Sequence, residues 1–323
     1  MDDPAARRRR VLVAAGLDPL LPMTRVASYA NEVWVGDDVV VRINYAGLLG
    51  AAPDRLLREA EIAARLTPEV RYPPIVAVGS EPADELTWIV CRRAPGMQLG
   101  RAWPTLSPAA RREAIHQLAA ALTVLHATPH EGLPPLEQQP PHTLPLDEIV
   151  ALTERLGADG HDRALLAELA AFARERWPAF ADAPRCLVHG DPHLENVLWD
   201  GMSVSALLDL EWSRAAWVEC DLEILLAVAA HPALFAASDY ERSLDPADFA
   251  DIPRWLLSAC PAWFAPARLL ERLELLLVSR TLGCLEDAEP APLATDPGLA
   301  LRIVHLRAVL DGTSYLRSQL ASL

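Results

Sequence analysis

Residues 187–200 read LVHGDPHLENVLWD, a polar loop between two short apolar runs, and a further apolar run, ALLDLEW, contains Asp209. The loop places Asp191 and Asn196 five residues apart, and Asp209 follows Asn196 after thirteen more. The apolar runs predict strands at 186–188, 197–199 and 204–208. Because side chains at a loop and at the end of a neighbouring strand can converge, this segment favours a fold that gathers two carboxylates and one carboxamide.

Phosphoryl transfer needs this set of side chains. One carboxylate orients the attacking hydroxyl, while an amide oxygen and a second carboxylate hold Mg²⁺ against the phosphates of a nucleotide. The order H-x-D-x-x-x-x-N followed by D is that of kinases. Asp and Asn are also common turn residues. The complete set, in order and beside apolar strands, favours phosphoryl transfer over simple turn capping.

The loop HGDxxxxN, followed by an apolar strand and D-x-E-W, resembles the aminoglycoside phosphotransferase and choline kinase family. It resembles protein kinases less, because glycine follows His189 and leucine follows Asp209. The resemblance implies that Asp191 is the catalytic base and that His189 supports the loop. It implies Asn196 and Asp209 as the Mg²⁺ ligands. The implied fold is α+β and protein-kinase-like, with a small antiparallel-sheet N-terminal lobe and a larger, mainly helical C-terminal lobe.

An upstream hairpin is predicted to cover the phosphates. Residues 26–43 read as strands separated by a small polar turn and by the tight turn Gly36-Asp37-Asp38. Phosphate lids usually contain glycines, because backbone N–H groups must approach closely, yet none lies between Val26 and Gly36. Ser28 and Asn31 would therefore contribute side-chain donors, as in the serine- and asparagine-containing first hairpin of the small-molecule kinases.

The next strand should carry a cation for the phosphates. All 29 basic residues of the chain are arginines, and Arg42 in VVVRI occupies the place where a lysine is commonest. Arginine can grip phosphate in a bidentate way and stays charged. Its expected partner is Glu59 in the helix that begins at Pro53, with Glu61 as the alternative. The competing interpretation is that these charges lie on solvated faces.

The segment RRAPGMQL breaks the strand pattern at Pro95-Gly96 and is expected to be the hinge between two lobes. Backbone groups from Cys91 to Arg93 would meet a purine edge there. An arginine at position 92 stands where an acidic residue is frequent in the family, so ATP and GTP both remain open as cofactors. We therefore divide the chain into a nucleotide-binding lobe, 1–94, and a catalytic and substrate-binding lobe, 95–323.

The second lobe reads as helices. Ser107-Pro108 is a helix-start signal, and a loop rich in proline is expected at 132–145. Asp221 is expected to cap the helix that follows it rather than to act in catalysis. Helices are predicted at 108–128, 146–156, 162–176, 267–284 and 297–320, together with a first helix packed on the small lobe.

Charge and cysteine content restrict the partners and the compartment. Residues 101–323 hold 31 acidic and 17 basic side chains, which argues against nucleic acid and anionic membranes as partners and would attract a cationic acceptor. The same charge could serve solubility alone. The five cysteines are widely spaced and odd in number, which is typical of reduced thiols. No apolar run is long enough to span a bilayer and no signal-peptide pattern is complete, so we expect a cytoplasmic protein.

Three functions follow from these observations. The first is a Mg²⁺- and nucleotide-dependent kinase acting on a hydroxyl of a small molecule. The resemblance implies that the acceptor is an antibiotic such as an aminoglycoside, macrolide or nucleoside, or a metabolite such as choline, an amino sugar, methylthioribose or homoserine. A lysine-free composition rich in alanine, proline and arginine suggests a GC-rich bacterial source, which favours an antibiotic. The second is a metal-dependent hydrolase using His189, Asp191 and His193, although no further ligand set accompanies them. The third is a kinase-shaped binding protein without turnover. No pattern bears on the oligomeric state.

Overall fold

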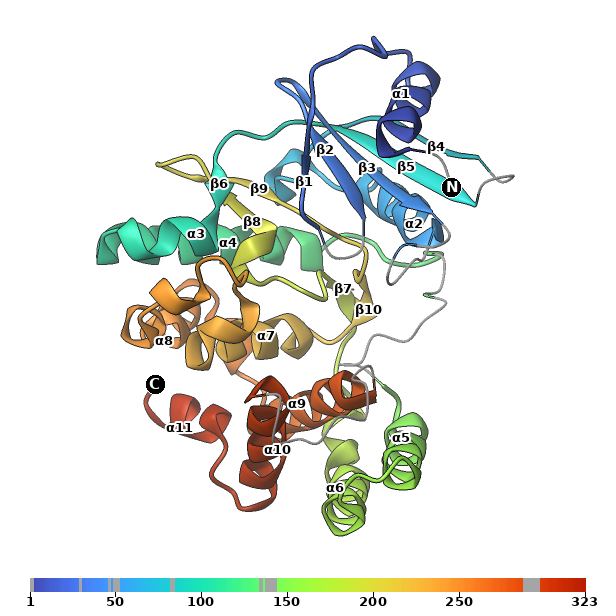
Figure 1. Cartoon of the computed structure of the whole chain (residues 1–323). Helices are drawn as coiled ribbons and strands as arrows, with labels where there is room; N and C mark the ends of the chain where they lie inside the picture. Colours follow the sequence, from blue (N-terminus) through green and yellow to red (C-terminus); the bar gives the residue numbers. More distant parts are fainter. Residues whose placement is uncertain are drawn as a thin grey trace.

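The chain is described by a computed structural model. It describes residues 3–28, 31–45, 48, 53–81, 85–133, 136, 144–286 and 297–323. A small lobe built on an antiparallel sheet lies above a larger, mainly helical lobe, which confirms the predicted α+β, kinase-like architecture (Figure 1). The predicted loop at 132–145 lies mostly outside the described residues.

The small lobe contains a five-stranded sheet in the order β1-β2-β3-β5-β4. All neighbouring strands are antiparallel. The strands are β1 Thr24–Val26, β2 Glu32–Val35, β3 Val39–Tyr45, β4 Ile75–Glu81 and β5 Leu86–Arg92. Strand β3 extends two residues beyond the predicted end at residue 43, because its pairing with β5 continues past the apolar run.

Alternation along the strands gives this sheet two different faces. Trp34, Val41 and Val90 lie opposite one another on one face and pack on helix α1, Pro4–Ala14. Residues in register with Arg42 point to the other face. That face is covered in part by helix α2, Pro53–Ala63, through Leu56.

Helix α1 confirms the predicted first helix on the small lobe. Arg7, only 4% exposed, donates through Nη2 to Glu32 Oε2 at 2.5 Å and to the Tyr45 hydroxyl at 3.0 Å. Its guanidinium carbon also lies 4.1 Å from the centre of the Tyr45 ring. A buried ion pair thus fixes this helix on the outer face of the sheet.

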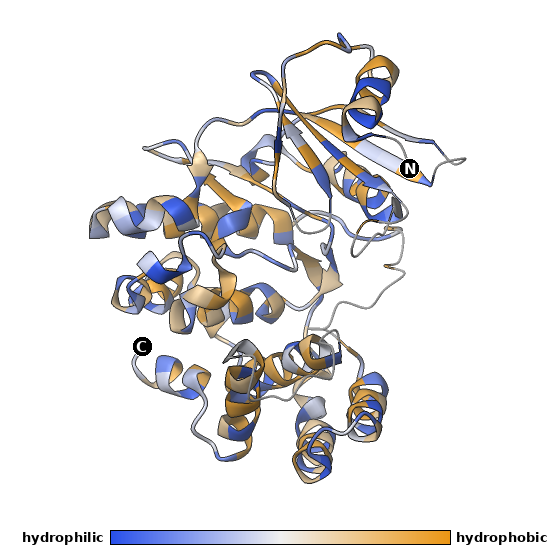
Figure 2. Cartoon of the chain, in the orientation of Figure 1, coloured by the Kyte–Doolittle hydropathy of each residue, from blue (hydrophilic) through white to orange (hydrophobic). Residues whose placement is uncertain are grey.

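Helices dominate the second lobe, in which α9 is largely hydrophobic (Figure 2). Residues at the predicted helical positions form helices with bounds close to those expected. The helices are α3 Leu99–Ala102, α4 Pro108–His126, α5 Leu146–Ala158, α6 Arg163–Arg176, α7 Glu219–Ala230, α8 Ile252–Ala259, α9 Leu269–Glu286, α10 Pro297–Leu310 and α11 Tyr315–Ala321. Ser107 caps α4 as predicted, since its hydroxyl accepts the N–H of Ala110 at 3.2 Å.

One predicted helix, 297–320, is wrong as a continuous element. The structure ends α10 at Leu310 and begins α11 at Tyr315. Gly312 adopts a φ of +68° between them, a left-handed conformation that commonly ends helices. Ser314 then caps α11 and donates its hydroxyl to Glu274 at 2.7 Å, which ties the new helix to α9.

Two small sheets lie where the lobes meet and frame the polar loop. One has the order β6-β8-β9 and the other pairs β10 with β7. The strands are β6 Met97–Gln98, β7 Cys186–Val188, β8 Val197–Trp199, β9 Val204–Leu207 and β10 Arg214–Ala216. The strands β7, β8 and β9 confirm the prediction. Strand β6, with two residues, is too short to give a signal, and β10, Arg-Ala-Ala, was not predicted because it contains no β-branched or aromatic residue.

Within the part of the chain that the structure describes, no helix is both long enough and apolar enough to cross a membrane. All five cysteines are free thiols, as their spacing predicted.

Candidate functional site

The polar loop after β7 is anchored by a carboxylate from another element. Asp221, which is fully buried, accepts the backbone N–H of His189 at 2.9 Å and that of Gly190 at 2.8 Å. Its Oδ2 also lies 2.8 Å from Nε2 of His126, at the end of α4. Burial raises the pKa of Asp221, but the hydrogen bond and charge of His126 outweigh it and leave the pKa below its usual value.

The predicted role of Asp221 as a helix cap is therefore wrong. Helix α7 starts at Glu219 after an N-cap at Val218, so Asp221 lies inside the first turn. Its carboxylate accepts from the loop instead, because those N–H groups are buried and need an acceptor. The signal for this role was the Asp-Leu pair downstream of Asp209, but only the tertiary structure shows which N–H groups it meets.

Gly190 is required by the local backbone. Its φ is +90°, and a Cβ atom there would lie 2.5 Å from the carbonyl oxygen of Trp212. No real side chain fits at that distance. The glycine in the HGD motif thus permits the loop to pass close to the chain before β10.

His189 ties the loop to the strand that precedes Asp209. Its fully buried ring donates from Nε2 to the carbonyl of Leu208 at 2.9 Å, since a carbonyl can only accept. Its Nδ1 accepts the N–H of Asp191 at 3.2 Å. Both ring nitrogens are thus committed to structural hydrogen bonds, so His189 cannot ligate a metal as the hydrolase hypothesis requires.

Asn196 supplies the second link between the loop and that strand. Its Nδ2 donates to the main-chain carbonyl of Asp191 at 2.9 Å, and the main-chain carbonyl of Asn196 accepts the N–H of Leu208 at 2.8 Å. Asp209 follows directly, with a φ of +65° that is uncommon for a residue other than glycine. The structure thereby brings Asp191, Asn196 and Asp209 close together, and we call this group of three residues the acidic corner.

Arg42 reaches the same corner from β3. Its Nη1 lies 2.6 Å from Glu59 Oε1 and its Nη2 lies 3.1 Å from Asp209 Oδ1. Burial lowers the pKa of Arg42, but the carboxylates of Glu59 and Asp209 outweigh burial and hold the pKa well above its usual value. The expected partner, Glu59, is thus the one that pairs with Arg42, and the alternative, Glu61, is exposed.

Glu59 also connects the two lobes. It is fully buried and accepts from the Tyr72 hydroxyl at 2.8 Å and from the N–H of Leu210, just past Asp209, at 3.2 Å. Sequence reasoning missed Tyr72, because a single tyrosine before a proline pair has no distinctive spacing. Glu59 therefore holds Arg42 and the strand end carrying Asp209 in a fixed relation.

A further acidic group, Glu211, lies beside Asp209. It is 6% exposed, and burial together with the charge of Asp209 raises its pKa to about 8. The D-x-E-W motif was the sequence signal for it. Ionisation of Glu211 is unfavourable because the group is buried and the carboxylate of Asp209 lies beside it. A positive charge bound nearby would reduce this repulsion and lower the pKa of Glu211.

The donor atoms at this corner suit Mg²⁺. Nδ2 of Asn196 is committed to Asp191, and Arg42 holds Oδ1 of Asp209. Among the described residues none donates a hydrogen bond to the remaining Asn196 Oδ1 or Asp209 Oδ2. Nor does this part of the chain contain a group of three or more His, Cys, Asp or Glu placed to hold a metal. Two oxygen ligands fit Mg²⁺, which usually retains waters and binds substrate phosphates as well.

The residues predicted to contact the nucleotide differ in how far they are exposed and in what they bind. Ser28 is exposed, whereas Asn31 is 6% exposed and its Oδ1 accepts from Asn44 Nδ2 at 3.1 Å, so that side chain is engaged inside the lobe. Tyr29 and Ala30 of the same turn lie outside the described residues. Cys91 lies on the face of the sheet that carries Arg42, and burial with the charge of Glu59 raises its pKa to about 12.

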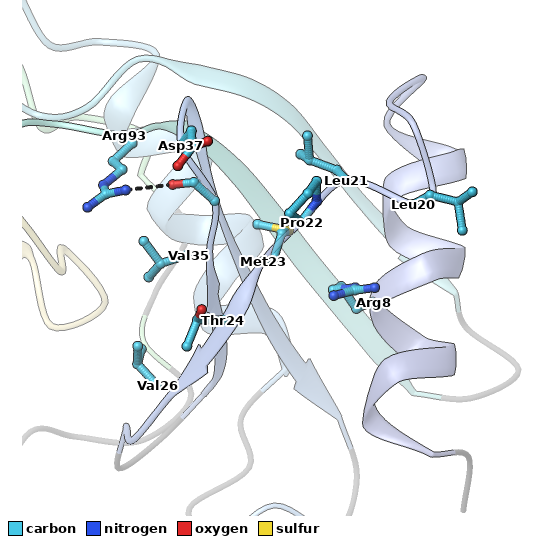
Figure 3. Close-up of a pocket in the computed structure, with 11 residues that line it drawn as sticks. Arg8, Leu20, Leu21, Pro22, Met23, Thr24, Val26, Val35, Asp37 and Arg93 are labelled. Atoms are coloured by element: carbon cyan, nitrogen blue, oxygen red, sulfur yellow. Dashed lines mark hydrogen bonds between the residues drawn. The ribbon is translucent and has the colours of Figure 1, made fainter.

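Arg93 lies at the hinge, where its Nη1 donates to the carbonyl of Gly36 at 2.9 Å. It also borders an open cavity of about 590 Å³ at the edge of β1, in which Val26 and Val35 point to the same side (Figure 3). The lining residues are Arg8, Leu20, Leu21, Pro22, Met23, Thr24, Val26, Val35, Gly36, Asp37 and Arg93. Asp191, Asn196 and Asp209 do not line this cavity, which therefore lies beside the predicted hinge and apart from those three residues.

Comparisons with known proteins give a consistent picture. The sequence model described as the phosphotransferase enzyme family matches residues 23–256. No curated protein sequence matches the chain.

Solved structures with a similar fold cover nearly the whole chain. An apo thermostable mutant of aminoglycoside phosphotransferase APH(4)-Ia is 17% identical, with a TM-score of 0.62 over 94% of this chain and 98% of that one. Aminoglycoside 2'-phosphotransferase-IIIa in complex with GDP is 14% identical, with a TM-score of 0.61 over 96% and 99%. A choline/ethanolamine kinase family protein from Mesorhizobium loti is 18% identical, with a TM-score of 0.60 over 99% and 100%. At these identities the likeness is one of fold.

Proposed function

The chain belongs to the phosphotransferase enzyme family, and from this premise we propose that it transfers the γ-phosphoryl group of ATP or GTP to a hydroxyl of a small molecule. One observation carries the proposal: Asp191, Asn196 and Asp209 are tied together by hydrogen bonds through His189 and Leu208. These are the residue types that phosphoryl transfer requires, gathered from two separate elements.

In the proposed reaction, Asp191 accepts a hydrogen bond from the acceptor hydroxyl and takes its proton as the oxygen attacks the γ-phosphorus. The bond between the γ-phosphorus and the bridging oxygen of the β-phosphate breaks, and the nucleoside diphosphate leaves with that electron pair. Asn196 and Asp209 would hold Mg²⁺, which neutralises phosphate charge when it is bound. Arg42 would turn from Asp209 towards the α and β phosphates, as its fork geometry allows two oxygens to be held at once. During this turn Glu59 would keep its ion pair with the guanidinium of Arg42.

The nucleotide would lie between the face of the sheet that carries Arg42 and the acidic corner. Ser28 and the turn after β1 would cover the phosphates, and the backbone near Cys91 and Arg93 would meet the base. Related structures support both nucleotides: one contains GDP, and others contain ADP or the ATP analogue AMP-PNP together with hygromycin B. Because ATP and GTP are abundant inside cells, we expect the protein to act in the cytoplasm.

The acceptor would be a small, cationic molecule with a free hydroxyl. The acidic second lobe, with 31 acidic and 17 basic residues at 101–323, would concentrate such a molecule near Asp191. An antibiotic of the aminoglycoside, macrolide or nucleoside type is our first choice, with resistance as the consequence. A metabolite such as choline, an amino sugar, methylthioribose or homoserine is the alternative, in keeping with the choline/ethanolamine kinase family protein of similar fold.

A panel assay tests this proposal. Purified protein is incubated with Mg²⁺, ATP or GTP and a mixed set of aminoglycosides, macrolides, nucleoside antibiotics and amino alcohols, and products are detected by the mass gain of one phosphate. We expect one class to be phosphorylated, and Asp191→Asn and Asp209→Asn each to abolish the product. Asp251→Asn, at an exposed carboxylate that is hydrogen-bonded to Arg254, serves as the matched control and should keep full turnover.

Two outcomes would contradict the proposal. Nucleotide-dependent thermal stabilisation without transfer to any compound would favour a kinase-shaped binding protein instead. Retention of turnover in Asp209→Asn would show that the metal is held elsewhere.

A further inference from the structure

His193 is a second histidine of the polar loop, and the proposed phosphoryl transfer as described so far gives it no role. It follows Asp191 by two residues and lies just before the short helical turn Leu194–Asn196. Its side chain is only 19% exposed, and its ring centre lies 6.0 Å from that of Phe235. The ring is therefore held in one orientation by its surroundings.

Both ring nitrogens of His193 face groups whose hydrogen-bonding character is fixed. Nδ1 accepts the backbone N–H of Glu195 at 3.3 Å, as in a helix cap. Nε2 lies 3.2 Å from Oδ2 of Asp191. Because an ionised carboxylate only accepts, Nε2 must carry the proton and donate it to this hydrogen bond.

Asn196 provides a parallel contact. Its Nδ2 donates to the main-chain carbonyl of Asp191 and lies 3.4 Å from Nε2 of His193. Both nitrogens are then donors directed at the same residue, one at its carbonyl and the other at its carboxylate. Asn196 thus holds the backbone of Asp191, and His193 holds its side chain.

We propose that His193 is a positioning residue that fixes the carboxylate of Asp191 through its Nε2–H, so that the other carboxylate oxygen is presented to the acceptor hydroxyl. This inference rests on the proposed function, because it assigns His193 a task within that reaction. The side chain of Asp191 is 33% exposed, and the contact with His193 restricts rotation of its carboxylate about the Cβ–Cγ bond. A misdirected base loses turnover much more than substrate binding.

Two substitutions separate the hydrogen bond from the packing of the ring. His193→Phe keeps an aromatic ring beside Phe235 but has no donor. His193→Gln gives up the ring, while its amide nitrogen reaches nearly as far as Nε2 and can donate to Asp191.

We expect kcat of His193→Phe to fall about 10- to 100-fold, as loss of one hydrogen bond to a charged group predicts. KM for the nucleotide should change less than about threefold, because the hydrogen bond that is removed holds Asp191, which acts on the acceptor hydroxyl and not on the nucleotide. His193→Gln should recover at least part of the lost kcat. Equal kcat in wild type and His193→Phe, or better turnover in His193→Phe than in His193→Gln, would overturn the proposal.

A spectroscopic measurement tests the same contact without any acceptor. Nitrogen-15 NMR of the imidazole rings, with His193 assigned by its absence in His193→Gln, reports which nitrogen carries the proton. We expect Nε2 of His193 to be protonated at neutral pH and to respond to Asp191→Asn. A ring protonated on Nδ1 alone would refute the inference even if the enzyme phosphorylates its acceptor. If the panel assay yields no product while Nε2 is protonated as expected, the proposed function fails and the contact stands.

Discussion

Two residues at the candidate site have left-handed backbone conformations. Gly190 has a φ of +90° and Asp209 a φ of +65°. Strain of this kind costs a non-glycine residue on the order of 1 kcal/mol and persists only where surrounding contacts enforce it. At Asp209 those contacts are made by its two neighbours in the chain. Leu208 is hydrogen-bonded to His189 and Asn196, and Leu210 to Glu59. They hold the Asp209 carboxylate on the same side as Asp191 and Asn196.

The first prediction separates backbone strain from steric crowding. Gly190→Ala should abolish turnover and lower the free energy of unfolding by more than about 3 kcal/mol, because a Cβ there would lie 2.5 Å from the carbonyl oxygen of Trp212. Gly201→Ala is the control: its φ is +104°, but nothing lies within 4 Å of its Cβ position. It should cost about 1 kcal/mol and leave turnover intact. Denaturant unfolding and kcat measure both variants, and equal losses would contradict the crowding argument.

Glu59 gives a second prediction at the residue scale. Glu59→Ala should lower the free energy of unfolding by about 3 kcal/mol, since it leaves buried Arg42 and Tyr72 without their shared acceptor. Glu61→Ala, at an exposed position two residues further along α2, should cost less than about 0.5 kcal/mol. Urea titration of both variants decides the matter. Similar midpoints would mean that Glu59 does not hold the two lobes together.

At the scale of elements, the site is built where four segments meet: the loop after β7, the end of β9, the first turn of α7 and the end of α4. Asp221 of α7 and His126 of α4 position the loop without any direct part in the proposed chemistry. Asp191 and Asn196 thus lie on a loop, and helices from the larger lobe hold that loop in place.

Asp221→Asn tests that arrangement. An asparagine retains one acceptor oxygen in place of two, so at least one of the N–H groups of His189 and Gly190 loses its partner. We expect about 2–4 kcal/mol of lost stability and at least a tenfold lower kcat, with nucleotide affinity unchanged. Thermal unfolding and steady-state kinetics provide the readouts. Unaltered kcat in a destabilised variant would show that the loop does not depend on this carboxylate for its geometry.

At the scale of the whole molecule, two histidine rings pack against each other where the end of α7 meets α10. The rings of His231 and His305 are 4.3 Å apart between centres, and the Nε2 atoms of both are buried without a hydrogen-bond partner in the described part of the chain. Burial, with the nearby charges of Arg280 and Arg302, lowers the pKa of His305 to about 4. Burial and Arg280 also lower the pKa of His231. Both rings are therefore neutral in the folded protein at neutral pH.

This pair predicts acid lability of the second lobe. Below the ordinary histidine pKa of 6.5 the unfolded chain binds a proton that folded His305 rejects until the pH reaches about 4. The free energy of unfolding should therefore fall as the pH drops from 6.5 to 4. His305→Gln, which cannot titrate, should lose less Tm between pH 7 and pH 5 than wild type does. Parallel Tm curves for the two proteins would contradict this prediction.

Local patterns determined much of the fold. Short apolar runs bounded by turn residues located several strands, and cap signals such as Ser107 located helix starts, because these features depend on residues close in sequence. The spacing of Asp191, Asn196 and Asp209 predicted their convergence for the same reason: a loop and the hairpin after it bring them together over a short stretch of chain. The two-residue strand β6 and the break before α11 were not predicted, since pairing with distant partners defines the first and a single left-handed glycine the second.

By itself, then, the sequence determined the lobe architecture, the reaction class it favours and the residues that lie close together along the chain. Only the tertiary structure decided between Glu59 and Glu61 as the partner of Arg42, and only it showed that Asp221 anchors the loop and that Asn31 is engaged inside the small lobe. The physical reason is that a buried polar group must find a partner, and the partner is set by packing between elements that are far apart in the chain.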